Sequence, residues 1–156
     1  MNKLLSTISI LFFCGFALAQ KPVIKWMTWD EAIAANAKNP KKIFIDVYTD
    51  WCGWCKVMDA KTFSDSAVAA YMSTNFYCVK LNAEQKADIN YKGVVFKYKP
   101  ESKVHELAYS LLNGEMMYPS YVFLTSTEKR ITIIKGYYEI DPFLKNLKTI
   151  KEFEEK

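Results

Sequence analysis

The sequence predicts a single α/β domain with a mixed central β-sheet flanked by helices. Runs of β-forming residues alternate with runs that repeat apolar residues at helical spacing. The last two β-rich runs are joined by a short polar turn, so this pair should be antiparallel. The chain has 156 residues, of which 51% are hydrophobic and 24% are charged. That length and composition suit one domain with a substantial core.

The expected elements can be placed from local signals. Thr28 and Glu31 have the spacing of a capping box, which opens the first helix. Asp141 followed by Pro142 should supply the N-cap and first-turn proline of the last helix. We expect strands at residues 43–48, 76–81, 120–125 and 130–135, helices at 29–39, 52–58, from 64, 103–112 and 141–150, and two short strands at 89–91 and 94–98.

The N-terminus has the order of a secretory signal peptide. Lys3 precedes a largely apolar run, residues 4–18, and Ala17 and Ala19 form a small-residue cleavage site. Residues 1–19 are therefore interpreted as a cleaved signal, and residues 20–156 as the exported domain. A retained anchor is the main alternative, but the run is shorter than a spanning helix requires. A lipid-modified Cys14 is disfavoured by the bulky residue before it.

Composition excludes several classes of function. The formal charge is +4, but the lysines are spread along the chain and interleave with acids, which argues against nucleic-acid binding. The exported part keeps three cysteines, Cys52, Cys55 and Cys78, which is a poor number for a disulfide scaffold. The chain has one histidine, His105, so a complete structural zinc site is not expected.

Cys52 and Cys55 form a C-x-x-C pair where a β-rich run leads into a helix. At a helix N-terminus, unpaired backbone N–H groups and the helix dipole favour a thiolate. The second cysteine lies almost one turn further on and can resolve a mixed disulfide by intramolecular attack. We therefore expect Cys52 to be the exposed nucleophile and Cys55 the buried resolving thiol.

From about residue 41 to residue 150 the chain resembles the thioredoxin superfamily. Thioredoxins carry a strand with a buried aspartate followed by a Trp-Cys-Gly-Pro-Cys-Lys run, and residues 44–56 keep that spacing, with Asp46 in the strand. Trp54 replaces the family's proline. The motif is also similar to thioredoxin-like domains of bacterial envelope electron-transfer proteins of the DsbD type. Residues 80–119 are about 20 residues longer than in small thioredoxins, which predicts an insertion at about 87–114.

The resemblance implies roles for further residues. Asp46 should exchange protons with Cys55, because a buried carboxyl has a raised pKa, and Lys80 matches the lysine that accompanies this aspartate. Pro119 matches the family's cis-proline. Cys78 is expected to be a small buried hydrophobe, and His105 is expected on a solvated helix face. The residues expected to contact substrate are Trp51, Gly53, Trp54, Tyr118 and Pro119.

These features predict a thioredoxin-like thiol–disulfide oxidoreductase that acts on protein substrates. It should need no cofactor beyond the Cys52–Cys55 pair and no metal. We expect a monomer in the periplasm or cell envelope, with no membrane span after signal cleavage, working in the reducing direction with electrons from a membrane donor. Two alternatives are a copper(I)-binding module that uses both thiols and a non-catalytic binding module on the same fold. The intact cysteine pair argues against the second.

Overall fold

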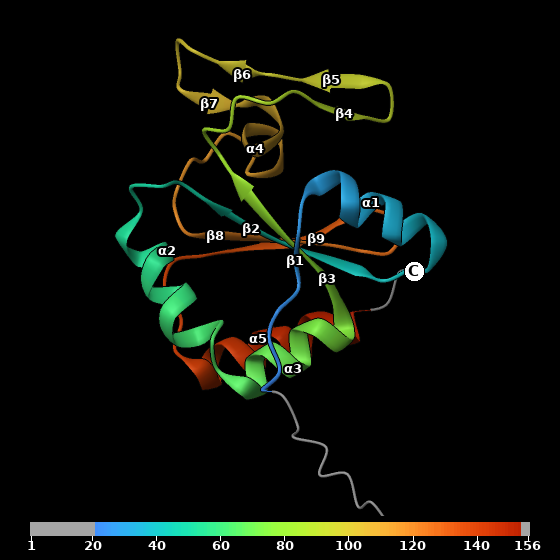
Figure 1. Cartoon of the computed structure of the whole chain (residues 1–156), viewed down its shortest axis with the longest axis vertical. Coiled ribbons are helices and arrows are strands. Elements are labelled where there is room, and N and C mark those ends of the chain that lie inside the picture. The colour runs from blue at the N-terminus through green and yellow to red at the C-terminus, as the bar shows by residue number, and fades with distance from the viewer. Residues whose placement is uncertain (1–20, 154–156) are drawn as a thin grey trace, which may run out of the picture.

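The computed structural model describes residues 21–153, and the expected signal peptide lies outside this range. The described chain folds into a central sheet with helices on both faces (Figure 1). The elements are β1 (Trp26–Met27), α1 (Trp29–Lys38), β2 (Lys42–Tyr48), α2 (Gly53–Val57), the π-helical turn η1 (Met58–Thr62), α3 (Ser66–Asn75), β3 (Phe76–Asn82), β4 (Ile89–Tyr91), β5 (Val94–Phe96), β6 (Tyr98–Lys99), β7 (Val104–His105), α4 (Glu106–Leu111), β8 (Ser120–Leu124), β9 (Arg130–Lys135) and α5 (Ile140–Glu152).

The main sheet has five strands in the order β1-β3-β2-β8-β9. The pairs β1·β3 and β2·β3 are parallel, whereas β2·β8 and β8·β9 are antiparallel. The predicted mixed sheet of a thioredoxin-like fold is therefore confirmed. Strand β2 lies at the centre of the sheet and is covered on both faces, so its five inner residues are buried. A strand in such a position must be almost entirely apolar.

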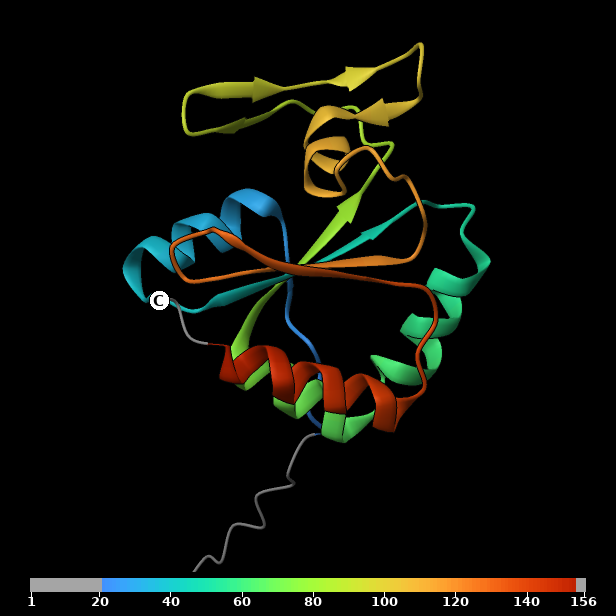
Figure 2. The same ribbon diagram turned by 180° about the vertical axis from the view of Figure 1, so that it is seen from behind.

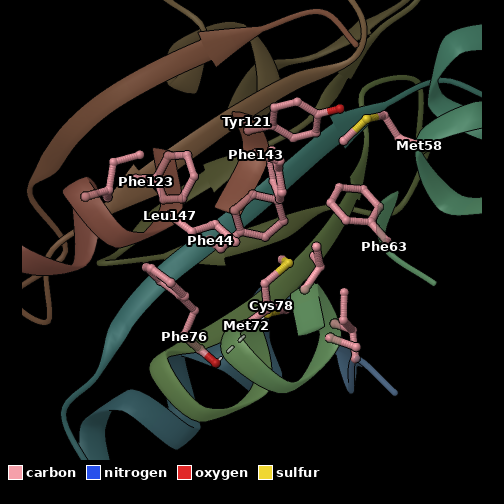
Figure 3. Packing of buried hydrophobic residues seen from close by; sticks show 14 residues of the cluster. Phe44, Met58, Phe63, Met72, Phe76, Cys78, Tyr121, Phe123, Phe143 and Leu147 are labelled. Carbon is pink, nitrogen blue, oxygen red and sulfur yellow. Dashed lines mark hydrogen bonds between the residues drawn. The ribbon is translucent and has the colours of Figure 1, made fainter. Parts of the chain in front are cut away.

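Two hydrophobic clusters fill the space between the sheet and its helices. Figures 1 and 2 show α3 and α5 on one face of the sheet and α1 and α4 on the other. One cluster lies under α3, α5 and η1, and the other lies under α1 and α4. In the first cluster Phe44 of β2 is surrounded by aromatic rings (Figure 3). Its ring centroid lies 5.2 Å from that of Phe123, 5.8 Å from Tyr121 and 6.0 Å from Phe63. Such tilted and stacked ring pairs stabilise a core beyond the effect of area burial.

Some element boundaries differ from the sequence-based expectations. The last helix begins at Ile140 with Glu139 as its N-cap, so the predicted N-cap Asp141 was wrong and lies in the first turn instead. The predicted helix over residues 103–112 begins only at Glu106, because the two residues before it form β7. The predicted strand over residues 94–98 is divided between β5 and β6.

Residues 89–111 fold as two small hairpins and a helix. Strand β4 pairs with β5, and β6 pairs with β7, both antiparallel. Figure 1 shows the two hairpins laid end to end above α4. The prediction that His105 lies on a solvated face was wrong, because its side chain is fully buried. Its Nδ1 accepts the Leu107 N–H at the start of α4, and its Nε2 lies 3.2 Å from the Ala87 carbonyl oxygen.

The capping box at the start of α1 is formed as predicted. The Glu31 N–H donates to Thr28 Oγ1 at 3.3 Å, and the Thr28 N–H donates to Glu31 Oε2 at 2.8 Å. Among residues 21–153, no helix combines the length and apolar character needed to cross a membrane.

We predict that Thr28→Ala lowers the free energy of unfolding by about 1 kcal/mol, because the first turn of α1 loses its side-chain acceptor. Thr28→Ser keeps an acceptor oxygen and should stay within experimental error of the natural protein. Urea unfolding followed by circular dichroism measures both variants. Equal losses in the two variants would contradict the capping role.

Candidate functional site

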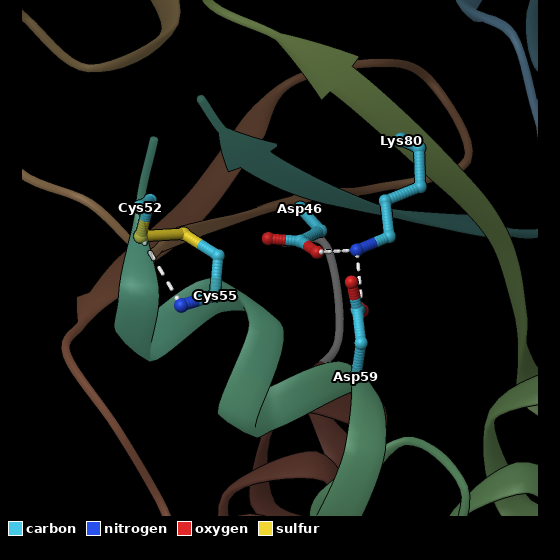
Figure 4. Close-up of polar contacts among 5 residues, drawn as sticks. All are labelled: Asp46, Cys52, Cys55, Asp59 and Lys80. Atoms are coloured by element: carbon cyan, nitrogen blue, oxygen red, sulfur yellow. Dashed lines mark hydrogen bonds and ion pairs between the residues drawn. A yellow bond between two sulfur atoms is a disulfide. The ribbon is translucent and has the colours of Figure 1, made fainter. Parts of the chain in front are cut away.

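The cysteine pair lies where β2 ends and α2 begins. Cys52 is the N-cap of α2, and its Sγ accepts the Cys55 N–H at 3.1 Å. Cys52 and Cys55 form a disulfide in this structure (Figure 4). Only the first sulfur receives a helix N–H, and a donor of this kind stabilises a negative charge on sulfur once the bond is reduced.

Both sulfur-bearing residues are almost completely covered. Cys52 is 4% exposed and Cys55 is 3% exposed. Burial of Cys55 agrees with its predicted position, but the expectation of an exposed Cys52 was wrong for this oxidised form. Packing of neighbouring segments, which helix and strand patterns do not predict, covers Cys52 almost as fully as Cys55.

A chain of three charged groups lies beside the disulfide. Lys80 Nζ is 2.6 Å from Asp46 Oδ2 and 2.5 Å from Asp59 Oδ1. Asp46 is 1% exposed, whereas the Asp59 side chain is 47% exposed. In Figure 4 the Asp46 carboxyl lies between the disulfide and the lysine, with its other oxygen on the cysteine side. That oxygen, Oδ1, is buried and has no hydrogen-bond partner within residues 21–153.

The register of the sheet brings this chain of charges together. Asp46 of β2 and Lys80 of β3 are directly paired across the parallel ladder. Asp59 lies in η1, the π-helical turn that directly follows α2 and ends where the Phe63 N–H donates to the Met58 carbonyl oxygen. Single π turns inside helices are frequent at functional sites. Regular helical spacing does not predict the position of Asp59, because the wider π turn changes the direction in which each of its side chains points.

Burial dominates the protonation of Asp46. Loss of hydration raises the pKa of this carboxyl from 3.8 to about 6, although the Lys80 ammonium acts in the opposite direction. Burial by itself lowers the pKa of Lys80, but Asp46 and Asp59 outweigh it and raise that pKa above its usual value. The Lys80 Nζ also lies 4.8 Å from the Trp26 ring centroid and 5.0 Å from the Tyr48 ring centroid, which adds cation–π stabilisation.

Trp51 forms one wall of the site and is held from two directions. Its ring centroid lies 5.8 Å from that of Tyr118 in an edge-on arrangement. Its Nε1 donates to Glu84 Oε1 at 3.1 Å. The Tyr118–Pro119 peptide bond is cis, as predicted. The expected contact residues Trp51, Tyr118 and Pro119 therefore gather at one rim.

Trp54 is the second exposed tryptophan next to the cysteine pair in the chain. It is 60% exposed, and its ring centroid lies 5.3 Å from that of Tyr137 in the segment between β9 and α5. Gly53 lies between the two tryptophans in the chain, and a Cβ added there would meet no atom within 4 Å. The space over Gly53 is consequently open.

The third cysteine of residues 21–153 is separate from the redox pair. Cys78 is a free thiol in β3, buried as predicted, and desolvation raises its pKa to about 12. Within the part of the chain that the structure describes, no group of three or more His, Cys, Asp or Glu side chains is arranged to hold a metal ion.

Three residues at the site were missed by the sequence analysis: Asp59, Glu84 and Tyr137. Glu84 lies four residues after Lys80 in the turn that leaves β3, and its only sequence signal was its position at a strand end. Tyr137 follows Gly136 after the last strand, and no local motif marked it. Their contacts with Lys80, Trp51 and Trp54 join segments that are distant in the sequence, so no motif spacing predicts these contacts.

Comparison with known proteins agrees with this geometry. The family model Thioredox_DsbH, described as "Protein of unknown function, DUF255", matches residues 3–151. The chain belongs to the Thioredox_DsbH family. Membership in the thioredoxin superfamily is thereby confirmed, and with the close cysteine pair it supports a thiol–disulfide redox role.

Curated relatives of this Thioredox_DsbH chain are much longer proteins. The thiol:disulfide interchange protein DsbD of Pectobacterium atrosepticum is 29% identical over 42% of the chain and 15% of its own length. Spermatogenesis-associated protein 20 of Mus musculus is 29% identical over 43% of the chain and 9% of its own length. The chain therefore spans only a small part of these relatives.

Solved structures share the fold. A protein titled DsbH Oxidoreductase has a TM-score of 0.60 at 17% identity, with 96% of each chain covered. A thioredoxin from Thermus thermophilus has a TM-score of 0.63 at 19% identity, with 81% of this chain and 86% of that chain covered. The C-terminal domain of Neisseria meningitidis DsbD has a TM-score of 0.52 at 21% identity, with 77% and 90% covered.

The raised pKa of Asp46 makes stability dependent on pH. The folded carboxyl holds its proton up to about pH 6, whereas the unfolded one loses it near 3.8, so the natural protein loses stability as pH rises through that range. Asp46→Asn removes the charge, and we predict a gain in unfolding free energy of up to about 3 kcal/mol at pH 8 that vanishes near pH 4.

Urea unfolding of the oxidised proteins at pH 4, 6 and 8 measures this difference. Asp30→Asn, on the first turn of α1, is a control for the loss of one carboxylate. A gap between the natural protein and Asp46→Asn that stays constant over the pH range would contradict the assignment.

Proposed function

We propose that this protein is a thiol–disulfide oxidoreductase that reduces disulfides in protein substrates through Cys52 and Cys55. The observation that supports it most strongly is the disulfide at the mouth of α2, with the Cys55 N–H directed at Cys52 Sγ. This arrangement gives the two sulfurs different roles. The first sulfur, which accepts the helix N–H, is the better thiolate, and the second sulfur lies within α2 where it can attack the first.

The reaction starts from the dithiol form. The Cys52 thiolate attacks one sulfur of the substrate disulfide, the substrate S–S bond breaks, and the other substrate sulfur leaves and takes up a proton. The Cys55 thiolate then attacks Cys52 Sγ, which closes the Cys52–Cys55 disulfide and releases the second substrate thiol. Two electrons and two protons pass to the substrate in each turnover.

Asp46 is proposed to accept the Cys55 proton during the second step. Its unpartnered Oδ1 lies on the cysteine side of the carboxyl (Figure 4). A pKa of about 6 suits proton exchange near neutral pH. Lys80 and the partly exposed Asp59 continue the charged chain towards solvent, so we assign Lys80 the role of holding Asp46 in position.

The proposed direction is reductive because the surroundings of the pair are acidic. Asp46 and Asp59 lie on one side, and Asp50, which accepts from Asn82 Nδ2 at 3.1 Å, lies two residues before Cys52. Carboxylates near a sulfur disfavour its thiolate and make the couple less oxidising. Regeneration then needs a dithiol donor, and we propose an envelope location with a membrane thiol transporter in that role. The similarity to DsbD, named a thiol:disulfide interchange protein, supports this placement.

The different roles of the two cysteines predict that their serine variants differ in how much mixed disulfide they trap. Cys55→Ser should accumulate mixed disulfides between Cys52 and protein substrates, since the resolving thiol is missing. Cys52→Ser should trap none, and Cys78→Ser should behave like the natural protein because that thiol is buried. Non-reducing gels of exported proteins measure this. Equal trapping by both active-site variants would overturn the assignment.

The acidic surroundings predict a reduction potential below about −200 mV, on the thioredoxin side of the known range. Equilibration of the purified protein with glutathione buffers, followed by quantification of both redox forms, measures it. A value near −120 mV, characteristic of strong oxidants, would reverse the proposed direction.

A further inference from the structure

Two buried polar atoms on neighbouring strands at the redox site lack a hydrogen-bond partner within residues 21–153. One is Asp46 Oδ1, and the other is the hydroxyl oxygen of Tyr121 in β8. The Tyr121 side chain is fully buried. A buried polar group without a partner is costly and uncommon in native proteins. Two such groups in one place therefore call for a functional explanation.

The register of the sheet places these two residues next to each other. Asp46 of β2 is paired with Tyr121 of β8 on one side and with Lys80 of β3 on the other. Directly opposed residues of antiparallel strands project to the same face of a sheet, with their Cβ atoms about 4.5–5.5 Å apart. Lys80 already binds Oδ2 of the carboxyl. Tyr121 is therefore the polar side chain on the neighbouring strand that remains for Oδ1.

The phenol ring of Tyr121 is held in place by aromatic packing. Its centroid lies 5.5 Å from that of Phe143 and 5.8 Å from that of Phe44. In Figure 3 its hydroxyl oxygen points towards the side on which Met58 lies. Met58 is the first residue of η1, which directly follows α2. The packed rings leave the phenol little freedom, so its hydroxyl has a fixed place on the side of the helical segment that carries the cysteines.

The charges around Tyr121 agree with this placement. Burial raises the pKa of its phenol far above the usual value, and the negative charges of Asp46 and Asp59 raise that pKa further. The phenol therefore keeps its proton at physiological pH and remains a donor close to a carboxylate. A hydroxyl also has acceptor lone pairs, whereas the ammonium of Lys80 can only donate. Tyr121 can consequently pair with the Asp46 carboxyl in both of its protonation states.

Building on the proposed function, we propose that Tyr121 is a positioning residue for the proton transfer from Cys55 to Asp46. Its hydroxyl donates a hydrogen bond to Oδ1 of the ionised carboxylate, directly or through one water molecule, and keeps this oxygen ready to accept a proton. In the transfer the Cys55 S–H bond breaks and an O–H bond forms at Oδ1, and the phenol then accepts from the protonated carboxyl. The Cys55 thiolate attacks Cys52 Sγ as described above.

Tyr121→Phe removes only the hydroxyl and tests this role. The pKa of Asp46 is measured in the oxidised protein by NMR titration of its carboxyl carbon, which needs no enzyme activity. Loss of a hydrogen bond to the charged form should raise this pKa from about 6 in the natural protein by about one unit. The ionised fraction of Asp46 at pH 6 then falls about fivefold. Resolution of a mixed disulfide by Cys55, measured in a single turnover, should slow by the same factor at pH 6 and match the natural rate at pH 9.

Two comparisons separate this role from a purely structural one. Tyr109→Phe removes a phenol hydroxyl from an exposed position on α4 and should leave the Asp46 titration unchanged. In the natural background, Tyr121→Phe should lower the folding equilibrium constant about tenfold more at pH 8 than at pH 4, since the one-unit shift acts only when Asp46 is ionised. In the Asp46→Asn background, the effect of Tyr121→Phe should be the same at both pH values.

Several results would overturn the positioning role. These are an Asp46 pKa that is equal in the natural protein and in Tyr121→Phe, the same shift in Tyr109→Phe, or unchanged resolution at pH 6 despite a shifted pKa. A gain in stability of the same size at every pH would also overturn it, because the hydroxyl would then be merely an unpaired buried group. Failure of the natural protein to reduce any disulfide would overturn the proposed function, whereas the Asp46 titration would still show whether Tyr121 bonds the carboxylate.

Discussion

The arrangement of the site centres on a carboxyl buried inside the main sheet. Asp46 interrupts an otherwise apolar central strand, and the fold surrounds it with an ammonium group, two aromatic rings near that ammonium and a second carboxylate. Burying a carboxylate is costly unless it is paired, and here one oxygen is paired while the other is not. This incomplete pairing fits the proton transfer proposed for Asp46, because a fully bonded carboxylate would stay ionised.

The central architecture could be predicted from the sequence because it follows from local patterns. Strand β2, the antiparallel pair β8·β9 and the capping box of α1 all rest on residue type and spacing. The cysteine pair and Asp46 were found for the same reason, because they lie within one short segment. The ion pair between Asp46 and Lys80 rested on family resemblance, and the parallel register of β2 and β3 supplies its physical basis.

The features that escaped prediction depend on contacts between distant segments. His105 has the spacing of a surface residue on a helix, but its two ring nitrogens contact the Ala87 carbonyl and the Leu107 N–H. Its role as a cap for α4 could not be inferred without knowing that β7 precedes the helix. Asp59 depends on a π turn, and Tyr137 depends on how the chain passes from β9 to α5. In each case the relevant partner is set by tertiary packing and not by sequence separation.

The burial of Cys78 has a consequence for the redox behaviour of the whole domain. A thiol with a pKa of about 12 is almost entirely uncharged at neutral pH, and uncharged thiols do not take part in exchange. Burial and the raised pKa of Cys78 therefore disfavour its exchange with the Cys52–Cys55 disulfide among the three cysteines in residues 21–153. Under the proposed function, each cycle of oxidation and reduction would therefore restore the same Cys52–Cys55 bond, because Cys78 offers no competing thiolate.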